Sequence, residues 1–326
     1  MTPVQISENP PLRPKEAQAM RTSATDLAPS FSRILLATDF SAASQTAFQT
    51  ALGICTALQA NLAILHVFET GVPLETEGQL LDLDRVYQSD QSSLDSLRET
   101  AQRAGVTCQA IMVNGVASLS IFETIQAKKI NLVVLGTNAP HGYEHLVFGS
   151  TAETILREAP CPVLTVGPQI SDLAKAGQLE GPVVFATDFD RTTSHAIRYA
   201  ASFCKITKSP LHCLNVLPRT LEAGSRSQII PTIMTEALHH VATASGTIID
   251  SPTCAVTYGS EISNAVVEYA KQHKARLIVL GIRQASIVAS HLPAHIAYRI
   301  ITESPCPVLT VAFASEPQST LADGVQ

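Results

Sequence analysis

A chain of 326 residues is long enough for two domains of ordinary size, and its 45% hydrophobic and 15% charged residues indicate a globular protein with large cores. The formal net charge of −6, without a long basic run, argues against nucleic acid as the main partner. No apolar run reaches about 18 residues, so we expect no transmembrane helix and no membrane partner.

The seven cysteines are scattered through apolar segments, and no two of them have the CxxC spacing of zinc or redox sites. An odd number of thiols in apolar surroundings is typical of reduced, buried cysteines in the cytoplasm. The first 30 residues lack the apolar core of a signal peptide. We therefore expect a cytoplasmic protein whose thiols belong to its cores.

The first 30 residues carry Pro3, Pro10, Pro11, Pro14 and Pro29 among polar residues, which predicts a flexible arm. After the arm, short apolar runs alternate with segments of helical periodicity, the pattern of parallel βαβ units. Right-handed crossovers would place the helices on both faces of one sheet. The expected strands are 33–37, 62–67, 107–113, 132–135 and 163–166, and the expected helices are 42–60, 79–104, 119–128 and 151–158.

The pattern restarts after a linker at 168–181. Thr187-Asp188-Phe189 repeats Thr38-Asp39-Phe40, and PCPVLTV occurs both at 160–166 and at 305–311. Such self-similarity indicates an internal duplication. The domains are then 31–167 and 182–313, followed by a polar tail at 314–326.

A glycine-bearing loop stands between the last two strands of the first half. Gly136 follows the strand 132–135, and Gly149-Ser150-Thr151 opens the short helix before Pro160. A helix N-terminus offers unpaired N–H groups and a partial positive charge, so it can hold a phosphate. Glycines at the two ends of the loop would let the backbone approach such a ligand.

These residues resemble the universal stress protein family in tandem-repeat form. Ala37-Thr38-Asp39-Phe40-Ser41 is similar to the end of that family's first strand, and Leu65-His66-Val67 to the end of its second. The family's ATP-binding pattern is Gly, two residues, Gly, nine residues, then Gly and Ser or Thr. The matching positions here are Gly136, Ala139 and Gly149-Ser150, with the spacing intact.

The resemblance implies an α/β fold of two tandem Rossmann-like domains, of the adenine nucleotide alpha hydrolase-like kind. Each would hold a five-stranded parallel sheet of order 3-2-1-4-5 with helices on both faces. A ligand would bind at the carboxyl ends of strands one and four, where the general rule for open parallel sheets also places it. The implied ligand is ATP, or AMP or ADP, with or without Mg²⁺.

The resemblance also implies roles for individual residues, and none of them is catalytic or metal-binding. Asp39 and Val67 would contact the adenosine, with Ala37 and Thr38 lining its pocket. The remaining residues of the implied site would line the ribose and phosphate path or hold the phosphates themselves. They are Gly136, Thr137 and Ala139 for the path, and Gly149, Ser150 and Thr151 for the phosphates; Leu135, directly before Gly136, completes the implied site.

The second half keeps Asp188, Val216 and Gly281 but differs at its phosphate end. Gln284 stands where the first half has Ala139, and Ala294-His295 replaces Gly149-Ser150 directly after a proline. Side chains at these positions would crowd an approaching phosphate. We therefore expect at most one nucleotide per chain, in the first half.

Simpler interpretations stay open beside these. Asp39 suits a turn, and Gly149-Ser150 suits a helix cap. His141 and His145, like His291 and His295, are four residues apart, but no carboxylate–histidine set accompanies them as in a metal site.

Three functions follow: a nucleotide-binding stress regulator, a nucleotide-free scaffold, or an ATP-hydrolysing or adenylating enzyme. The enzyme is disfavoured because no glycine follows the first strand, and no paired carboxylates or Ser-His-Asp set appear.

The two final strands, 163–166 and 308–311, would each leave an unpaired sheet edge. Unpaired N–H and C=O groups at such an edge invite aggregation unless they are covered. Pairing the two strands with each other would satisfy both edges with local two-fold symmetry. We expect the two halves to pack in this way as an internal pseudo-dimer, and the pairing of whole chains into a homodimer stays open.

Overall fold

The computed structural model describes residues 29–69, 77–137, 149–170, 180–188, 196–221, 230–244, 249, 251–284 and 293–314. The first half alternates strands and helices as its periodicity predicts. Its elements are β1 (Arg33–Ala37), α2 (Ala42–Leu58), β2 (Asn61–Phe68), α3 (Glu77–Arg103), β3 (Cys108–Asn114), α4 (Ala117–Lys128), β4 (Leu132–Gly136), α5 (Ser150–Glu158) and β5 (Val163–Val166).

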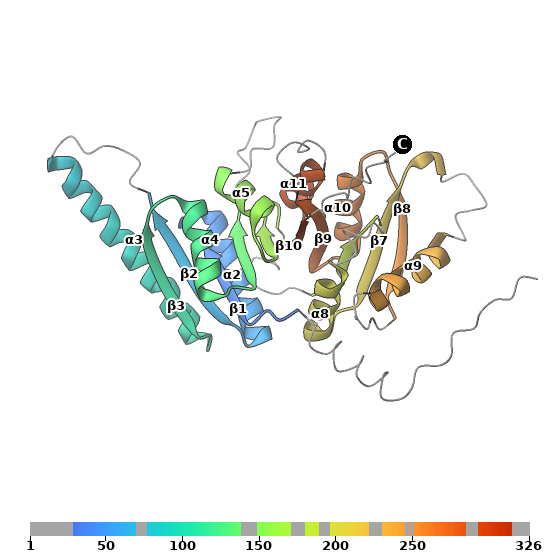
Figure 1. Ribbon diagram of the computed structural model, residues 1–326, viewed down its shortest axis with the longest axis horizontal. Helices are drawn as coiled ribbons and strands as arrows, with labels where there is room; N and C mark the ends of the chain where they lie inside the picture. Colours follow the sequence, from blue (N-terminus) through green and yellow to red (C-terminus); the bar gives the residue numbers. More distant parts are fainter. Residues whose placement is uncertain are drawn as a thin grey trace, which may run out of the picture.

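The second half repeats this succession (Figure 1). A short 3₁₀ turn, Arg219–Leu221, is added after its second strand. Its other elements are β6 (Val183–Ala186), α8 (Ile197–Thr207), β7 (Leu211–Leu217), α9 (Ile230–Ala244), β8 (Thr253–Tyr258), α10 (Ile262–Gln272), β9 (Leu277–Gln284), α11 (Pro293–Glu303) and β10 (Val308–Ala314).

Ten strands form one sheet in the order β3-β2-β1-β4-β5-β10-β9-β6-β7-β8. Within each half all neighbouring strands are parallel, and the order of the first five strands across the sheet is the expected 3-2-1-4-5. The second half shows the same order in reverse across the sheet. The α/β fold class inferred from the sequence is therefore confirmed.

The inner strands are apolar on both sides because helices cover both faces of the sheet. On β1, Ile34 and Leu36 point into one core, which they share with α2, α3, α8 and α9. Leu35 points into the other core, which is built with α4, α5, α10 and α11. The two-sided burial explains why the strands appear in the sequence as continuous apolar runs rather than alternating ones.

The two halves join through their final strands, as the unpaired edges predicted. β5 and β10 lie side by side and are antiparallel, with Leu164 opposite Leu309 (Figure 1). Phe31, just before β1, adds a second contact, since its ring centroid lies 5.4 Å from that of Phe203 and 6.0 Å from that of Tyr199 on α8. The pairing removes two open edges at once.

Three of the cysteines are buried in the cores and the other four are half-buried and pack against them, so the expectation of buried thiols is met in part. All seven carry free thiols. Burial raises the pKa of four of these thiols to about 12, so they stay protonated and unreactive at neutral pH. The four are Cys55, Cys161, Cys204 and Cys306.

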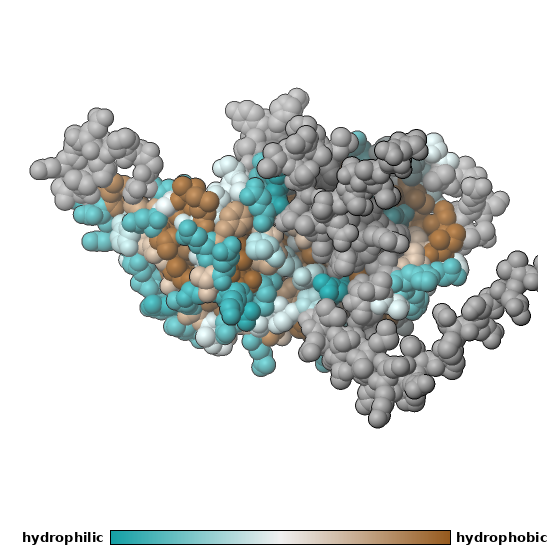
Figure 2. Space-filling view, viewed as in Figure 1, coloured by the Kyte–Doolittle hydropathy of each residue, from teal (hydrophilic) through white to brown (hydrophobic). Residues whose placement is uncertain are grey.

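In the part of the chain that the structure describes, no helix is both long enough and apolar enough to pass through a bilayer. Figure 2 shows apolar surface (brown) over both halves in separate areas between polar side chains (teal).

The seam between the halves is the pairing of β5 with β10, and each of these strands carries one threonine at the equivalent position. Thr310 Oγ1 donates to the carbonyl of Val163 at 3.1 Å, whereas Thr165 Oγ1 is buried without a hydrogen-bond partner among the described residues. A buried unpaired hydroxyl costs roughly 1–3 kcal/mol. We therefore predict that Thr165→Val raises the free energy of unfolding by about 1 kcal/mol and that Thr310→Val lowers it by a similar amount.

Chemical denaturation of the two variants and the parent provides the measurement. Valine has nearly the shape of threonine, so the comparison isolates the hydroxyl. Equal effects of both substitutions would contradict the proposed difference between the two hydroxyl groups.

Candidate functional site

Three apolar side chains of the implied site lie on neighbouring strands and on one face. Ala37 at the end of β1 is in register with Leu135 on β4, and Val67 lies two residues beyond Leu65, its partner on β2. All three belong to or pack against the core on the α4 and α5 face. The structure thus brings Ala37, Val67 and Leu135 together at the carboxyl edge of the sheet, on the side where α5 lies.

Thr38 is used by the turn that leads from β1 to α2. Its N–H donates to the carbonyl of Leu65 at 2.9 Å, and its hydroxyl donates to Ser44 Oγ at 3.1 Å and accepts the N–H of Phe40 at 3.1 Å. The side chain is buried. Thr38 therefore holds the backbone of this edge in place, and its hydroxyl group is committed to that structure.

Asp39 is exposed at the start of α2. Its Oδ1 accepts the N–H of Ser41 at 3.0 Å, while Ser41 caps α2 by accepting the N–H of Ser44 at 3.3 Å. Partial burial alone raises the pKa of the Asp39 carboxyl, but hydrogen bonds from Ser41 and Ser44 outweigh it and the pKa falls below its ordinary value. An ionised carboxylate therefore lies at this edge of the sheet. Asp39 also has the structural role in the turn that the simpler interpretation gave it.

Phe40 and His66 form a contact that the sequence analysis did not single out. Phe40 has a left-handed backbone with φ of 60°, a conformation that costs a bulky residue on the order of 1–3 kcal/mol. Its ring lies 4.5 Å from the ring of His66, whose Nδ1 is 2.9 Å from the carbonyl oxygen of Thr38. One histidine within the apolar strand LAILHV was the signal that could have identified it.

Gly136 is a glycine for a packing reason. A Cβ at this position would lie 2.4 Å from the backbone carbonyl of Ala43 and 2.7 Å from the nitrogen of Ser44. The start of α2 therefore presses against the end of β4. The absence of a side chain at Gly136 is explained without a ligand.

Thr137 is turned toward β5. Its N–H donates to the carbonyl of Val166 at 3.0 Å and its hydroxyl to the same oxygen at 3.4 Å, and the side chain is buried. Only its backbone can therefore line a ligand path. Ala139, the third residue expected along that path, lies outside the described residues.

Gly149 differs from Gly136, because nothing lies within 4 Å of the position that its Cβ would take. It is the N-cap of α5 and provides no side-chain cap. The first hydrogen bond of the helix runs from the N–H of Glu153 to the carbonyl oxygen of Gly149 at 3.0 Å. The N–H groups of Ser150, Thr151 and Ala152 precede it and have no acceptor within the helix. An exposed helix N-terminus of this kind favours a negatively charged ligand.

The second half copies the adenosine end of this arrangement. Thr187 donates its N–H to Leu214 at 3.0 Å, as Thr38 does to Leu65, and Asn215 Nδ2 donates to the carbonyl of Thr187 at 2.8 Å. Asn215 therefore occupies the place of His66. The shared geometry shows that each half needs a side-chain donor under the end of its first strand.

The end of the site that is expected to hold phosphates differs between the halves already in the backbone. β4 ends at Gly136, whereas β9 continues three residues past Gly281, to Gln284, which pairs with Ala314 of β10. α11 then begins at Pro293. Residues 285–292 and the side chains of 293–295 lie outside the described part, so the expected crowding by Ala294 and His295 stays a prediction.

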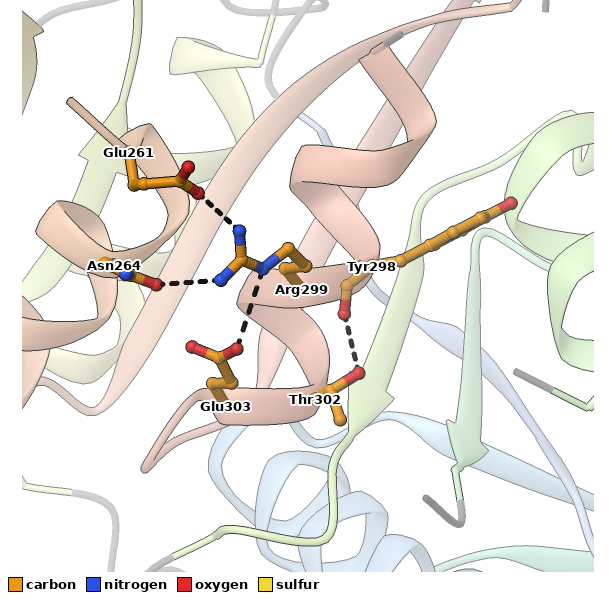
Figure 3. A network of polar contacts seen from close by, with 6 residues as sticks. All are labelled: Glu261, Asn264, Tyr298, Arg299, Thr302 and Glu303. Atoms are coloured by element: carbon orange, nitrogen blue, oxygen red, sulfur yellow. Dashed lines mark hydrogen bonds and ion pairs between the residues drawn. The ribbon is translucent and has the colours of Figure 1, made fainter. Parts of the chain in front are cut away.

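A charged network joins the last two helices of the second half (Figure 3). From α11, Arg299 donates to Glu261, to Asn264 Oδ1 at 3.2 Å, and pairs with Glu303 at 3.7 Å. By the offset of the repeat, the first half has Val116, Leu119 and Thr154 in place of Glu261, Asn264 and Arg299. Val116 and Leu119 are exposed at 57% and 59%, so this link between helices is absent from the described first half.

No group of three or more metal-ligating side chains occurs within the described ranges. His141, His145 and His291 lie outside those ranges, as does the side chain of His295. The interpretation of these histidines as solvated side chains therefore remains a prediction.

The contrast between the two glycines gives a direct test. We predict that Gly136→Ala lowers the free energy of unfolding by roughly 2 kcal/mol or more, because backbone atoms of α2 must move to admit the methyl group. Gly149→Ala should cost less than about 1 kcal/mol, since its Cβ meets nothing. Thermal and denaturant unfolding of both variants is the measurement. Equal losses would mean that the close approach of α2 to β4 is not a constraint.

Comparison with known proteins matches the chain in two separate parts. The model of the universal stress protein family matches residues 30–167 and again 181–312. Universal stress protein MJ0531 of Methanocaldococcus jannaschii is 30% identical over 140 residues, which cover 42% of this chain and 82% of that protein. Universal stress protein YxiE of Bacillus subtilis is 27% identical over 146 residues, covering 42% of this chain and 99% of that protein.

Among solved structures, a universal stress protein from Archaeoglobus fulgidus superimposes with a TM-score of 0.67 at 18% identity. The match covers 86% of this chain and 98% of that one, so the fold is shared over both halves. MJ0531 and YxiE each match about the length of one half of this chain, and the family model matches twice. The chain therefore belongs to the universal stress protein family and carries its domain in tandem.

Proposed function

We propose that this protein is a cytoplasmic stress-response regulator that binds an adenine nucleotide in its first half and has no strong catalytic activity. The ligand is ATP, or AMP or ADP, with or without Mg²⁺. One observation carries the proposal: α5 opens at a glycine that packing does not require, with an exposed and uncapped N-terminus. This helix end lies on the same sheet face as the apolar ends of β1 and β2.

In this proposal the two ends of the site have different chemistry. Ala37, Val67 and Leu135 offer apolar surface to the base, and the backbone around Thr38 and Asp39 offers polar atoms. The ribose and phosphates would then pass the backbone of Gly136, Thr137 and Ala139. Gly149, Ser150 and Thr151 would hold the phosphates through N–H and hydroxyl groups.

The second half would serve as the structural partner of the first. We propose domain limits of 31–167 and 182–313, with the halves acting as an internal pseudo-dimer across the seam. The longer β9 and the diverged start of α11 support the assignment of the second site as degenerate. Pairing of whole chains would add to this arrangement without replacing it.

A nucleotide-free scaffold is the second candidate, and a specific observation favours it. The side chains of Thr38, Asp39 and Thr137 already make hydrogen bonds within the protein. These residues therefore have structural roles with or without a ligand. The test below separates the two functions.

We predict that native mass spectrometry of the full chain, titrated with ATP and magnesium, shows one bound nucleotide per chain. The expected reason is that the first half has apolar strand ends on the same sheet face as α5, which opens at a glycine, whereas the sequence of the second half has Ala294-His295 at the equivalent helix start. Two tightly bound nucleotides would show that the second half is active. If no nucleotide binds in the titration, and none co-purifies with the protein under native conditions, the nucleotide-free scaffold is favoured.

We also predict that Gly149→Asp weakens ATP binding. A carboxylate near the phosphates adds a repulsion of about 1 kcal/mol at about 4 Å in water, and several-fold more in a shielded site. Asparagine and aspartate cap helices about equally well, so Gly149→Asn is the matched control for the charge. Calorimetry should show a loss of affinity with Asp that exceeds any loss with Asn. Equal affinities of these two variants would remove α5 from the binding site.

A further inference from the structure

His66 occupies a buried position under the turn between β1 and α2. Only 8% of the residue is exposed. Its Nδ1 lies 2.9 Å from the carbonyl oxygen of Thr38, and its Nε2 lies 3.3 Å from Oδ2 of Asp90 on α3. The imidazole thus bridges the end of the first strand and a helix that packs against the edge of the sheet.

The two contacts of His66 demand different numbers of protons. A carbonyl oxygen only accepts hydrogen bonds, so Nδ1 must carry a proton to bond Thr38. A carboxylate also only accepts, so Nε2 must carry a proton to bond Asp90. Both bonds exist together only when the imidazole is protonated. In the neutral ring one bond is lost, and with Nδ1–H retained a lone pair faces the carboxylate.

The turn above His66 is sensitive to this change. The Phe40 ring packs against the imidazole with a centroid distance of 4.5 Å and an interplanar angle of 35°, and Phe40 holds a left-handed backbone next to Asp39. A cation close to an aromatic ring face is attracted to it, so protonation strengthens this contact. The turn that carries Asp39 is thus in direct contact with the imidazole through Phe40 and Thr38.

Other charged groups around His66 leave Asp90 as its charged partner. The residue in register on β3 is Met112, which does not titrate. At the end of β1, the Asp39 carboxylate accepts from Ser41 in its own turn. Across the described segments, Asp90 is the charged group within ion-pair distance of His66.

The second half provides a natural control. Asn215 donates to the carbonyl of Thr187 at 2.8 Å, the same bond that His66 makes to Thr38. An amide does not change its charge with pH. The hydrogen bond to the strand end is therefore a shared structural requirement, and the proton-dependent link to α3 belongs to the first half.

We propose that protonation of His66 regulates the first-half site, by tying the turn at Asp39 and Phe40 to α3 through Asp90. The effect of this protonation on ATP affinity rests on the proposed nucleotide function. Histidine side chains change charge between about pH 5 and 8, so the site is more ordered, and binds more tightly, at the acidic end of that range.

The test compares the full-length parent with His66→Asn and Asp90→Asn, using ATP as the probe at about pH 5.5 and about pH 8. Asn at 66 keeps the bond to Thr38, as Asn215 demonstrates, but cannot titrate. Asn at 90 can either accept from or donate to the imidazole, so it keeps contact in both states. The ratio of parent to variant affinity cancels the titration of ATP itself.

We expect that ratio to fall roughly three- to tenfold from about pH 5.5 to about pH 8. A change of this size corresponds to about one net hydrogen bond. A ratio that stays constant for both variants would overturn the proposal. The pH profile separates regulation from a merely structural role, which would weaken binding equally at both pH values.

A ligand-free measurement distinguishes failure of this inference from failure of the nucleotide function. The amide NMR signals of Asp39 and Phe40 should move with pH in the parent and not in His66→Asn. Signals that move in a protein that does not bind ATP would support the proton-dependent turn and refute the nucleotide function. Signals that stay fixed in the parent would refute the role of His66 whatever ATP does.

Discussion

The antiparallel pairing of β5 with β10 is the constraint on which the rest of the structure depends. Each half alone is a five-stranded sheet that ends in a short apolar strand with one unpaired edge. Joining these edges makes one ten-stranded sheet and lets two continuous cores run across both halves. The seam fixes α5 and α11 on the same face, and therefore fixes where the helix that opens the candidate site can stand.

The two halves keep the same frame but use it differently. Both place a side-chain donor under the end of the first strand, His66 in one and Asn215 in the other. Beyond that point they diverge: the second half extends β9 and ties α11 to α10 through Arg299 (Figure 3). The first half leaves α5 with an open N-terminus and an apolar neighbourhood at the start of α4.

The sequence predicted the fold well because its main signals are local. Apolar runs on doubly covered strands, the alternation with helices and the internal repeat identify the architecture without any long-range information. The strand order came from the family resemblance. What the sequence could not provide was the reason for each residue. Gly136 and Gly149 look alike in the pattern, but only the approach of α2 shows that the first is a packing glycine. His66 was missed because its partner Asp90 is distant in sequence.

The covalent link between the halves changes how the seam behaves on dilution. In an assembly of two separate chains, an edge such as β5 would become exposed whenever the concentration fell below the dissociation constant. Here β10 belongs to the same polypeptide, so pairing is an intramolecular event with an effective concentration of about the millimolar order. The edge therefore stays covered at any abundance of the protein, and a cell can keep very few copies without losing the paired form.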